Sequence, residues 1–146
     1  MILTVNVEKV ISRDCDEVFE ALSNPAQMRH YFISSSSGKL EAGKDVIWRW
    51  EDVGAELSIR VLQADKASKT IEFHWDASGI KTRVKITLEQ AGKKTVVKIY
   101  ETGWESNEEG IQRYGQQIEG WVDMVTCMKA YLEFGINLRA GKVVGE

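Results

Sequence analysis

The sequence has few of the residues from which metal sites and redox centres are built. It contains two cysteines and two histidines among 146 residues. Cys15 and Cys127 lack metal-ligand spacing and fall in expected helices, so we interpret them as reduced packing residues in a reducing compartment, by default the cytoplasm. HExxH, CxxC and repeated-Asp motifs are absent, and Gly110, Gly115 and Gly120 fall in an expected helix and do not form a phosphate loop. We expect neither a metal nor another cofactor.

Long apolar runs and an excess of positive charge are also missing. No apolar run approaches the roughly 20 residues that cross a bilayer, and residues 1–10 lack the basic and apolar segments of an export signal. The net charge of −3, with no cluster of Lys and Arg, argues against nucleic acid as the main partner. The remaining composition, 43% apolar and 28% charged, is typical of globular proteins. We expect one domain over residues 1–146, without a membrane span.

The single proline helps to locate two short helices near the N-terminus. Pro25 follows Asn24, which is the arrangement of an N-cap followed by proline in the first helical position. An earlier helix is expected to begin at Asp14, where Glu17 completes a capping box. Alternation of apolar and polar residues over 2–11 predicts a strand before these helices.

Residues 33–103 alternate with a period of two, and turn residues separate the short runs. A last strand is expected over about 95–102. Such alternation predicts an antiparallel meander with one solvated face and one covered face. The covered face of the first four strands is expected to consist of Val46, Trp48, Trp50, Leu57, Ile59, Val61, Ile71, Phe73, Trp75, Ile80, Val84, Ile86 and Leu88.

The C-terminal region predicts a long helix from about residue 107 to Leu138, which Ser106 and Glu109 begin as a second capping box. Its apolar residues form two adjacent stripes that span about 200° of the helical wheel, against about 100° for an ordinary surface helix. We expect this helix to lie in the trough of a curved sheet, with the second stripe facing the far limb of the sheet or a cavity. The stripes are Ile118, Trp121, Val125, Met128 and Leu132, and Met124, Cys127, Tyr131, Phe134 and Leu138.

The order of strand, two short helices, six-strand meander and long helix resembles the helix-grip fold of the START-like superfamily, which includes polyketide cyclases and birch-pollen-allergen proteins. Residues 16–25 (DEVFEALSNP), Tyr31-Phe32, residues 71–75 (IEFHW) and Gly120-Trp121 are more specifically similar to bacterial activator-of-heat-shock-protein-90-ATPase homologues. This resemblance implies an α+β fold, in which a curved antiparallel sheet of about seven strands wraps around the C-terminal helix and leaves a hollow between them. It implies no particular reaction.

The sequence departs from this family pattern near the expected hollow. Members often have tryptophan where His30-Tyr31 precede Phe32, and a glycine pair where residues 34–37 are serines. The departure implies a different entrance to the pocket.

Aromatic residues are the most informative candidates for a site. Trp48, Trp50 and Trp75 fall on the covered face of the meander, and Trp104 and Trp121 flank the start of the terminal helix. For any one of them plain core packing is the favoured interpretation, and the functional alternative is the wall of a mostly apolar pocket. The predicted ligand-binding set is Tyr31, Trp48, Trp50, Trp75, Glu101, Trp104, Trp121, Val125 and Met128.

Glu101 is the one candidate acid or base. It shares a face with Val97 and Ile99, so its carboxylate either points into the hollow or lies at a strand end near water, and we favour the second. A buried Glu101 would need a partner, for which Arg83 is a candidate if the face of its strand flips. His30 and His74 are assigned surface or structural roles, because no residue is spaced to form a triad with either.

Three functions remain open. The first is a non-enzymatic domain that binds a hydrophobic, lipid-like or aromatic molecule between sheet and helix. The second, implied by the resemblance, is a co-chaperone-like module that contacts a heat-shock protein of the 90-kDa class through its outer surface. The third is a cyclase or hydrolase that works in the hollow through Glu101. We expect a monomer or a weak homodimer.

Overall fold

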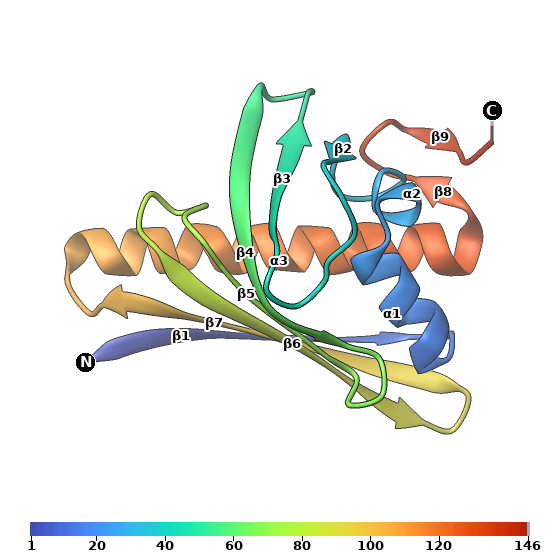
Figure 1. The fold of residues 1–146 in the computed structure, drawn as a ribbon, viewed down its shortest axis with the longest axis horizontal. Coiled ribbons are helices and arrows are strands. Elements are labelled where there is room, and N and C mark those ends of the chain that lie inside the picture. Colours follow the sequence, from blue (N-terminus) through green and yellow to red (C-terminus); the bar gives the residue numbers. More distant parts are fainter. Residues whose placement is uncertain (146) are drawn as a thin grey trace.

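The computed structural model describes residues 1–145 and has the α+β helix-grip architecture (Figure 1). A long strand and two short helices precede a six-strand meander, and a long helix and a small hairpin follow it. The elements are β1 (Ile2–Ile11), α1 (Cys15–Ser23), α2 (Pro25–Met28), β2 (Ser35–Ser36), β3 (Asp45–Trp50), β4 (Ala55–Asp65), β5 (Thr70–Trp75), β6 (Thr82–Ala91), β7 (Lys94–Glu105), α3 (Glu108–Phe134), β8 (Ile136–Asn137) and β9 (Lys142–Val143).

Seven strands form one antiparallel sheet in the order β1-β7-β6-β5-β4-β3-β2. Consecutive strands from β2 to β7 are neighbours, as the alternating sequence predicts for a meander, and β1 closes the edge beside β7. Side chains of one parity face the inside, because successive residues of a strand point to opposite faces. In β7, for example, Val97, Ile99 and Glu101 are all buried.

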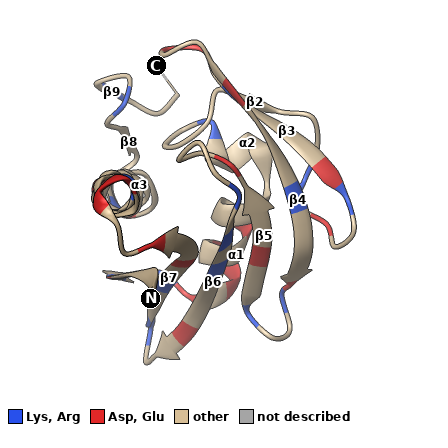
Figure 2. Ribbon diagram, turned by 90° about the vertical axis from the view of Figure 1, so that its left-hand side faces the viewer, with Lys and Arg blue, Asp and Glu red and all other residues tan. Residues whose placement is uncertain are grey.

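The sheet curves around α3, which lies along its concave side (Figure 2). Helices α1 and α2 lie at the end of this trough, near the C-terminal part of α3 (Figure 1). The core between these layers is strongly aromatic and includes Trp48, Phe73, Trp104 and Trp121. The sequence prediction that the terminal helix covers the sheet and encloses the indole rings is confirmed.

The N-caps of α1 and α2 are the predicted ones, whereas the Glu17 carboxylate of the expected capping box pairs with Arg13. The Asp14 carboxylate accepts a hydrogen bond from the Glu17 backbone N–H. The Asn24 side chain accepts one from the Ala26 N–H, and Pro25 occupies the first helical position of α2. Each cap satisfies an N–H group that the first helical turn leaves without a partner.

α3 begins near residue 107 as predicted, but its predicted N-cap and its predicted C-terminal end are wrong. Its N-cap is Asn107, whose side chain accepts from the Gly110 N–H at 2.8 Å, so Ser106 and Glu109 do not form the expected capping box. At the other end, Gly135 adopts the left-handed conformation with φ of 66° and terminates the helix at Phe134.

The apolar residues beyond that point do not extend the stripe. Phe134 is 67% exposed and Leu138 is 48% exposed, so neither belongs to the buried second stripe. Ile136 instead pairs with Val143 in the hairpin of β8 and β9, which the sequence pattern did not predict. In the meander, Ile80 is 38% exposed because it lies in the turn before β6, and β7 is longer than the expected strand.

Both cysteines are free and buried. Burial, reinforced by the negative charge of Asp123, raises the pKa of the Cys127 thiol, which keeps it protonated. Among residues 1–145, no helix has the length and apolarity needed to span a bilayer, and no group of three or more His, Cys, Asp or Glu side chains is arranged to hold a metal ion.

Candidate functional site

The centre of the candidate site is the carboxylate of Glu101, which is fully buried. Its Oε1 accepts hydrogen bonds from the Trp121 indole N–H at 2.7 Å and the Gln117 amide at 2.9 Å. Its Oε2 accepts from the Trp75 indole N–H at 2.9 Å and the Thr82 hydroxyl at 2.5 Å, with the Gln117 amide at 3.2 Å. Four neutral side chains therefore surround one acidic group.

These five residues come from four elements that the fold brings together. Glu101 lies on the inner face of β7, and β6 pairs with β7 so that Val84 lies opposite it. Thr82 begins β6 two residues earlier on the same face, and Trp75 lies opposite Thr82 on β5. α3 crosses above them and supplies Gln117 and Trp121, which are four residues apart and share one helix face.

The expectation that Glu101 lies near water is wrong. The burial of Glu101 is tolerated because each of its hydrogen-bond partners is a donor, and an ionised carboxylate accepts hydrogen bonds at both oxygens. Arg83, the candidate partner from the sequence, points to the other face of β6, where its guanidinium binds both carboxylate oxygens of Glu72 at 2.5 and 2.7 Å. No positively charged side chain among the described residues bonds Glu101.

A small pocket of about 90 Å³ opens beside this centre, lined by Phe32, Trp75, Gln117, Gly120 and Trp121. The indole rings of Trp75 and Trp121 are stacked, with their centroids 5.3 Å apart. The ring centroids of Phe32 and Trp121 are 6.3 Å apart. Gly120 contributes no side chain, and a Cβ added there would meet no atom within 4 Å. Three aromatic rings and one polar amide thus surround a space next to a buried carboxylate.

Other aromatic rings support this wall from behind. Phe32 packs edge-on against Trp48 and Trp50, with 5.5 Å between centroids in both pairs. Trp48 in turn contacts Phe73 and Trp75 in the same edge-to-face manner, which is a favourable arrangement for aromatic pairs. The Trp48 indole N–H is buried without a hydrogen-bond partner among residues 1–145.

The structure brings together part of the predicted ligand-binding set. Trp75 and Trp121 line the pocket, Glu101 lies directly behind them, and Trp48 and Trp50 form the second layer. The remaining predicted residues pack elsewhere in the core: Tyr31 donates to the Ala21 carbonyl oxygen, Trp104 donates to the Ser78 hydroxyl, and Val125 and Met128 are buried residues of α3.

Sequence reasoning missed four residues of the site. Phe32 and Gly120 appeared in the family resemblance, but neither was predicted to line the pocket. Thr82 and Gln117 were not considered at all, although a signal existed for each. Thr82 is a polar residue between Ile80 and Val84 on an otherwise apolar face, and Gln117 lies one helical turn before Trp121.

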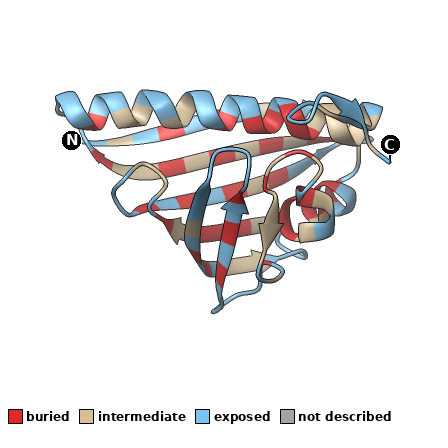
Figure 3. Ribbon diagram, turned by 90° about the horizontal axis from the view of Figure 1, so that it is seen from above, coloured by how far each residue is buried: buried red, intermediate tan, exposed pale blue. Residues whose placement is uncertain are grey.

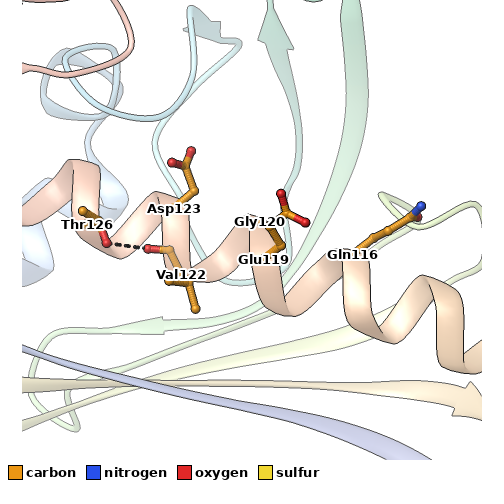
Figure 4. A pocket seen from close by; sticks show the side chains of 6 residues that line it. All are labelled: Gln116, Glu119, Gly120, Val122, Asp123 and Thr126. Carbon is orange, nitrogen blue, oxygen red and sulfur yellow. Dashed lines mark hydrogen bonds between the residues drawn. The ribbon is translucent and has the colours of Figure 1, made fainter.

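A larger depression of about 620 Å³ lies on the exposed side of α3, lined by Gln116, Glu119, Gly120, Val122, Asp123 and Thr126 (Figure 4). All six residues belong to the same helix, and the Thr126 hydroxyl donates to the Val122 carbonyl oxygen at 2.8 Å. Because no second element provides an opposite wall, this surface cannot enclose a small molecule. Gly120 lines both this depression and the small pocket.

The sequence profile of one family, described as Activator of Hsp90 ATPase homolog 1-like protein, matches residues 13–133. The chain belongs to this family. The resemblance identified from the sequence is thereby confirmed. No curated protein sequence matches the chain.

Solved structures share the fold of this family member. Protein SSP2350 from Staphylococcus saprophyticus is 30% identical with a TM-score of 0.83, and the match covers 94% of this chain and 96% of that one. DynU16, a putative protein in the dynemicin biosynthetic locus, is 23% identical with a TM-score of 0.81, over 92% of this chain and 48% of that one. The Aha1 dimer from Colwellia psychrerythraea is 18% identical with a TM-score of 0.77, over 91% and 98%.

Proposed function

We propose that the protein binds a small aromatic or apolar molecule between α3 and the sheet. The observation that supports this most directly is the pocket in which Phe32, Trp75 and Trp121 surround an open space beside Gly120. Small-molecule sites are concave and mostly apolar, with a few placed polar groups. The Gln117 amide and the Glu101 carboxylate behind it are such groups.

The size of the pocket favours a ligand that inserts one ring or chain end. A space of about 90 Å³ is below the roughly 300–1,000 Å³ of sites that enclose a drug-sized molecule. A larger ligand would therefore leave part of its surface outside, over Gly120, or would displace the partly exposed Gln117 side chain. We retain Tyr31, Trp50, Trp104, Val125 and Met128 in this proposal as buried core residues that do not line the pocket.

Substitution of Gly120 by leucine tests the proposal. The added side chain starts in open space and fills the mouth of the pocket, and leucine favours a helix more than glycine does. Gly115→Leu is the matched control, because Gly115 lies in the same helix, also faces open space and does not line the pocket.

The measurement is a titration followed by tryptophan fluorescence, with fatty acids, sterols, flavonoids and simple aromatic compounds as ligands. We expect saturable binding of at least one class by the wild type and by Gly115→Leu, and a loss of at least about tenfold in affinity for Gly120→Leu. The absence of a response to the whole panel, or equal binding by the two variants, would contradict the proposal.

Contact with a heat-shock protein of the 90-kDa class is a second candidate. It is supported by membership of the family described as Activator of Hsp90 ATPase homolog 1-like protein. It is also supported by the similarity of the fold to an Aha1 protein solved as a dimer. A pull-down with the cognate chaperone, with and without nucleotide, is the test. Sedimentation of the purified protein would show whether it is a monomer or a weak homodimer, and fractionation would test the expected cytoplasmic location.

A further inference from the structure

The hydrogen bonds of Glu101 indicate which chemical group its neighbourhood could accept. Both oxygens receive only donors, and two of these are indole N–H groups, which cannot act as acceptors. This arrangement suits the ionised carboxylate. Arg113 lies one helical turn before Gln117 on α3, and its guanidinium is engaged by the Ser78 carbonyl oxygen and by Glu109. The described residues thus leave one buried negative charge without a cationic partner.

Only one of the four donors can leave without disturbing the core. Trp75 and Trp121 are buried and stacked on each other, and Thr82 is buried at the start of β6. Gln117 is partly exposed, lines the pocket and contacts both carboxylate oxygens. Rotation of the Gln117 side chain toward solvent would therefore open a path from the pocket to Glu101.

We infer that the ligand carries a positively charged nitrogen that replaces the Gln117 amide at Glu101, with an aromatic or apolar body held by Phe32, Trp75 and Trp121. This inference deepens the proposed function and rests on it. An ammonium group has several N–H donors and can bond both oxygens that the amide now bonds, with charge-assisted and therefore stronger hydrogen bonds.

Charges at the surface favour the approach of such a ligand. Glu119 and Asp123 lie on consecutive turns of α3, on either side of Gly120, and both are exposed (Figure 4). Neither is ion-paired with a Lys or Arg within the part of the chain that the structure describes. Negatively charged carboxylates around an opening raise the local concentration of cations and lower that of anions.

Three ligands that share a benzyl or phenyl group and differ in charge provide the test: benzylammonium, benzyl alcohol and benzoate, each at neutral pH. Binding is measured by calorimetry and by the NMR signals of the five tryptophan indole N–H groups. We expect benzylammonium to bind at least about tenfold more tightly than benzyl alcohol, and benzoate to bind least, because a charge-assisted bond to a desolvated carboxylate exceeds a neutral one. The signals of Trp75 and Trp121 should shift most.

Glu101→Gln is the isosteric variant that removes the charge, and Glu108→Gln, on the exposed first turn of α3, removes one carboxylate elsewhere. Glu101→Gln should reduce the preference for ammonium to within about threefold of benzyl alcohol, while Glu108→Gln keeps it. Gln117→Ala, which leaves Glu101 intact, should increase the preference, because the competing amide is gone. That variant tests the inference even if Glu101→Gln does not fold.

The outcomes separate the two proposals. Equal binding of benzylammonium and benzyl alcohol by the wild type, an unchanged preference in Glu101→Gln, or an unchanged or reduced preference in Gln117→Ala overturns the inference about charge. If neutral aromatic compounds or lipids still bind in a manner that Gly120→Leu blocks, the proposed function stands. If no compound in either panel binds, both fail.

Discussion

The two halves of α3 meet the sheet through different chemistry. From Trp121 onward the helix buries Trp121, Met124, Val125, Cys127 and Met128, whereas the only buried residue before that point is Gly110 (Figure 3). The first half packs only partly buried apolar side chains, Tyr114 and Ile118, against the core, and it makes polar contacts through Arg113 to Ser78 and through Gln117 to Glu101.

Because of this difference, the second half of α3 contributes most to the stability of the fold, whereas the first half contains the contacts that a ligand can replace. Apolar burial stabilises the second half by roughly 25 cal/mol per Å² of area removed from water, and close packing resists movement there. Polar contacts of part-exposed side chains can exchange with water or with a ligand at little net cost. The candidate pocket lies where the two halves meet, between Gln117 and Trp121.

Truncation of a buried methionine in the second half of α3 should lower the stability of the protein most. Met128 is fully buried, so Met128→Ala is expected to lower the free energy of unfolding by about 2–5 kcal/mol. Ile111 is 55% exposed in the first half, and Ile111→Ala should change it by less than about 0.5 kcal/mol. Urea denaturation followed by circular dichroism measures both. Similar losses for the two variants would refute the contrast between the halves.

Loss of the Glu101 charge should have the next largest effect on stability. In Glu101→Gln one of the two carboxylate oxygens becomes an amide NH₂, and whichever way it points, one indole N–H loses its acceptor, because Trp121 bonds Oε1 and Trp75 bonds Oε2. An unsatisfied buried donor costs about 1–3 kcal/mol. Glu108→Gln is the solvated control. Urea denaturation of the two variants should show the difference, and an equal stability would mean that the donors find other acceptors.

Alanine in place of glycine should have opposite effects on the stability of the protein in the middle and at the end of α3. Gly135 has φ of 66°, a conformation that costs a residue with a Cβ about 1–2 kcal/mol. Gly120 lies in the helix interior with open space around its Cβ position, and Gly120→Ala should raise stability by about 0.5–1 kcal/mol. Thermal unfolding of both variants checks the signs, and a destabilised Gly120→Ala would contradict the open space at the pocket.

The smallest expected effect is a pH dependence that comes from His30, which stacks on Tyr131 of α3 with centroids 5.2 Å apart. Burial, followed by the positive charges of Arg29 and Lys142, lowers the pKa of His30 below its ordinary value of 6.5. The unfolded chain therefore binds more protons just below pH 6.5, so stability should decrease as the pH falls through that region toward the lower folded pKa.

His30→Gln should flatten this decrease. Urea denaturation at a series of pH values between about 7 and 5 gives the measurement. A decrease that persists unchanged in His30→Gln would assign it to other groups.

The sequence predicted the architecture because its signals are local and periodic. Alternation placed Val97, Ile99 and Glu101 on one face, and the caps at Asp14 and Asn24 began the first two helices where expected. The ends of α3 were harder to predict. Ser106 and Asn107 are both competent caps, and the apolar pattern continues past Gly135 although the backbone there turns left-handed.

The candidate site was only partly predictable, because it depends on which residues meet across elements. Inward-facing tryptophans at positions 48, 50, 75 and 121 follow from periodicity, but their separation into pocket wall and second layer does not. For Glu101, the face was correctly assigned and the environment was not. A carboxylate at that position can be solvated or buried, and the choice depends on whether donors from other elements reach it.

The amino-acid order by itself determined the strand parity, the order of the elements and the apolar stripes of the terminal helix, because each depends on side chains a few residues apart. Only the tertiary structure decided that the Glu101 carboxylate is buried among donors from β5, β6 and α3, and that a small pocket remains beside Gly120. Both features arise where segments distant in the chain converge, and their geometry depends on sheet curvature and the path of α3, which no local pattern specifies.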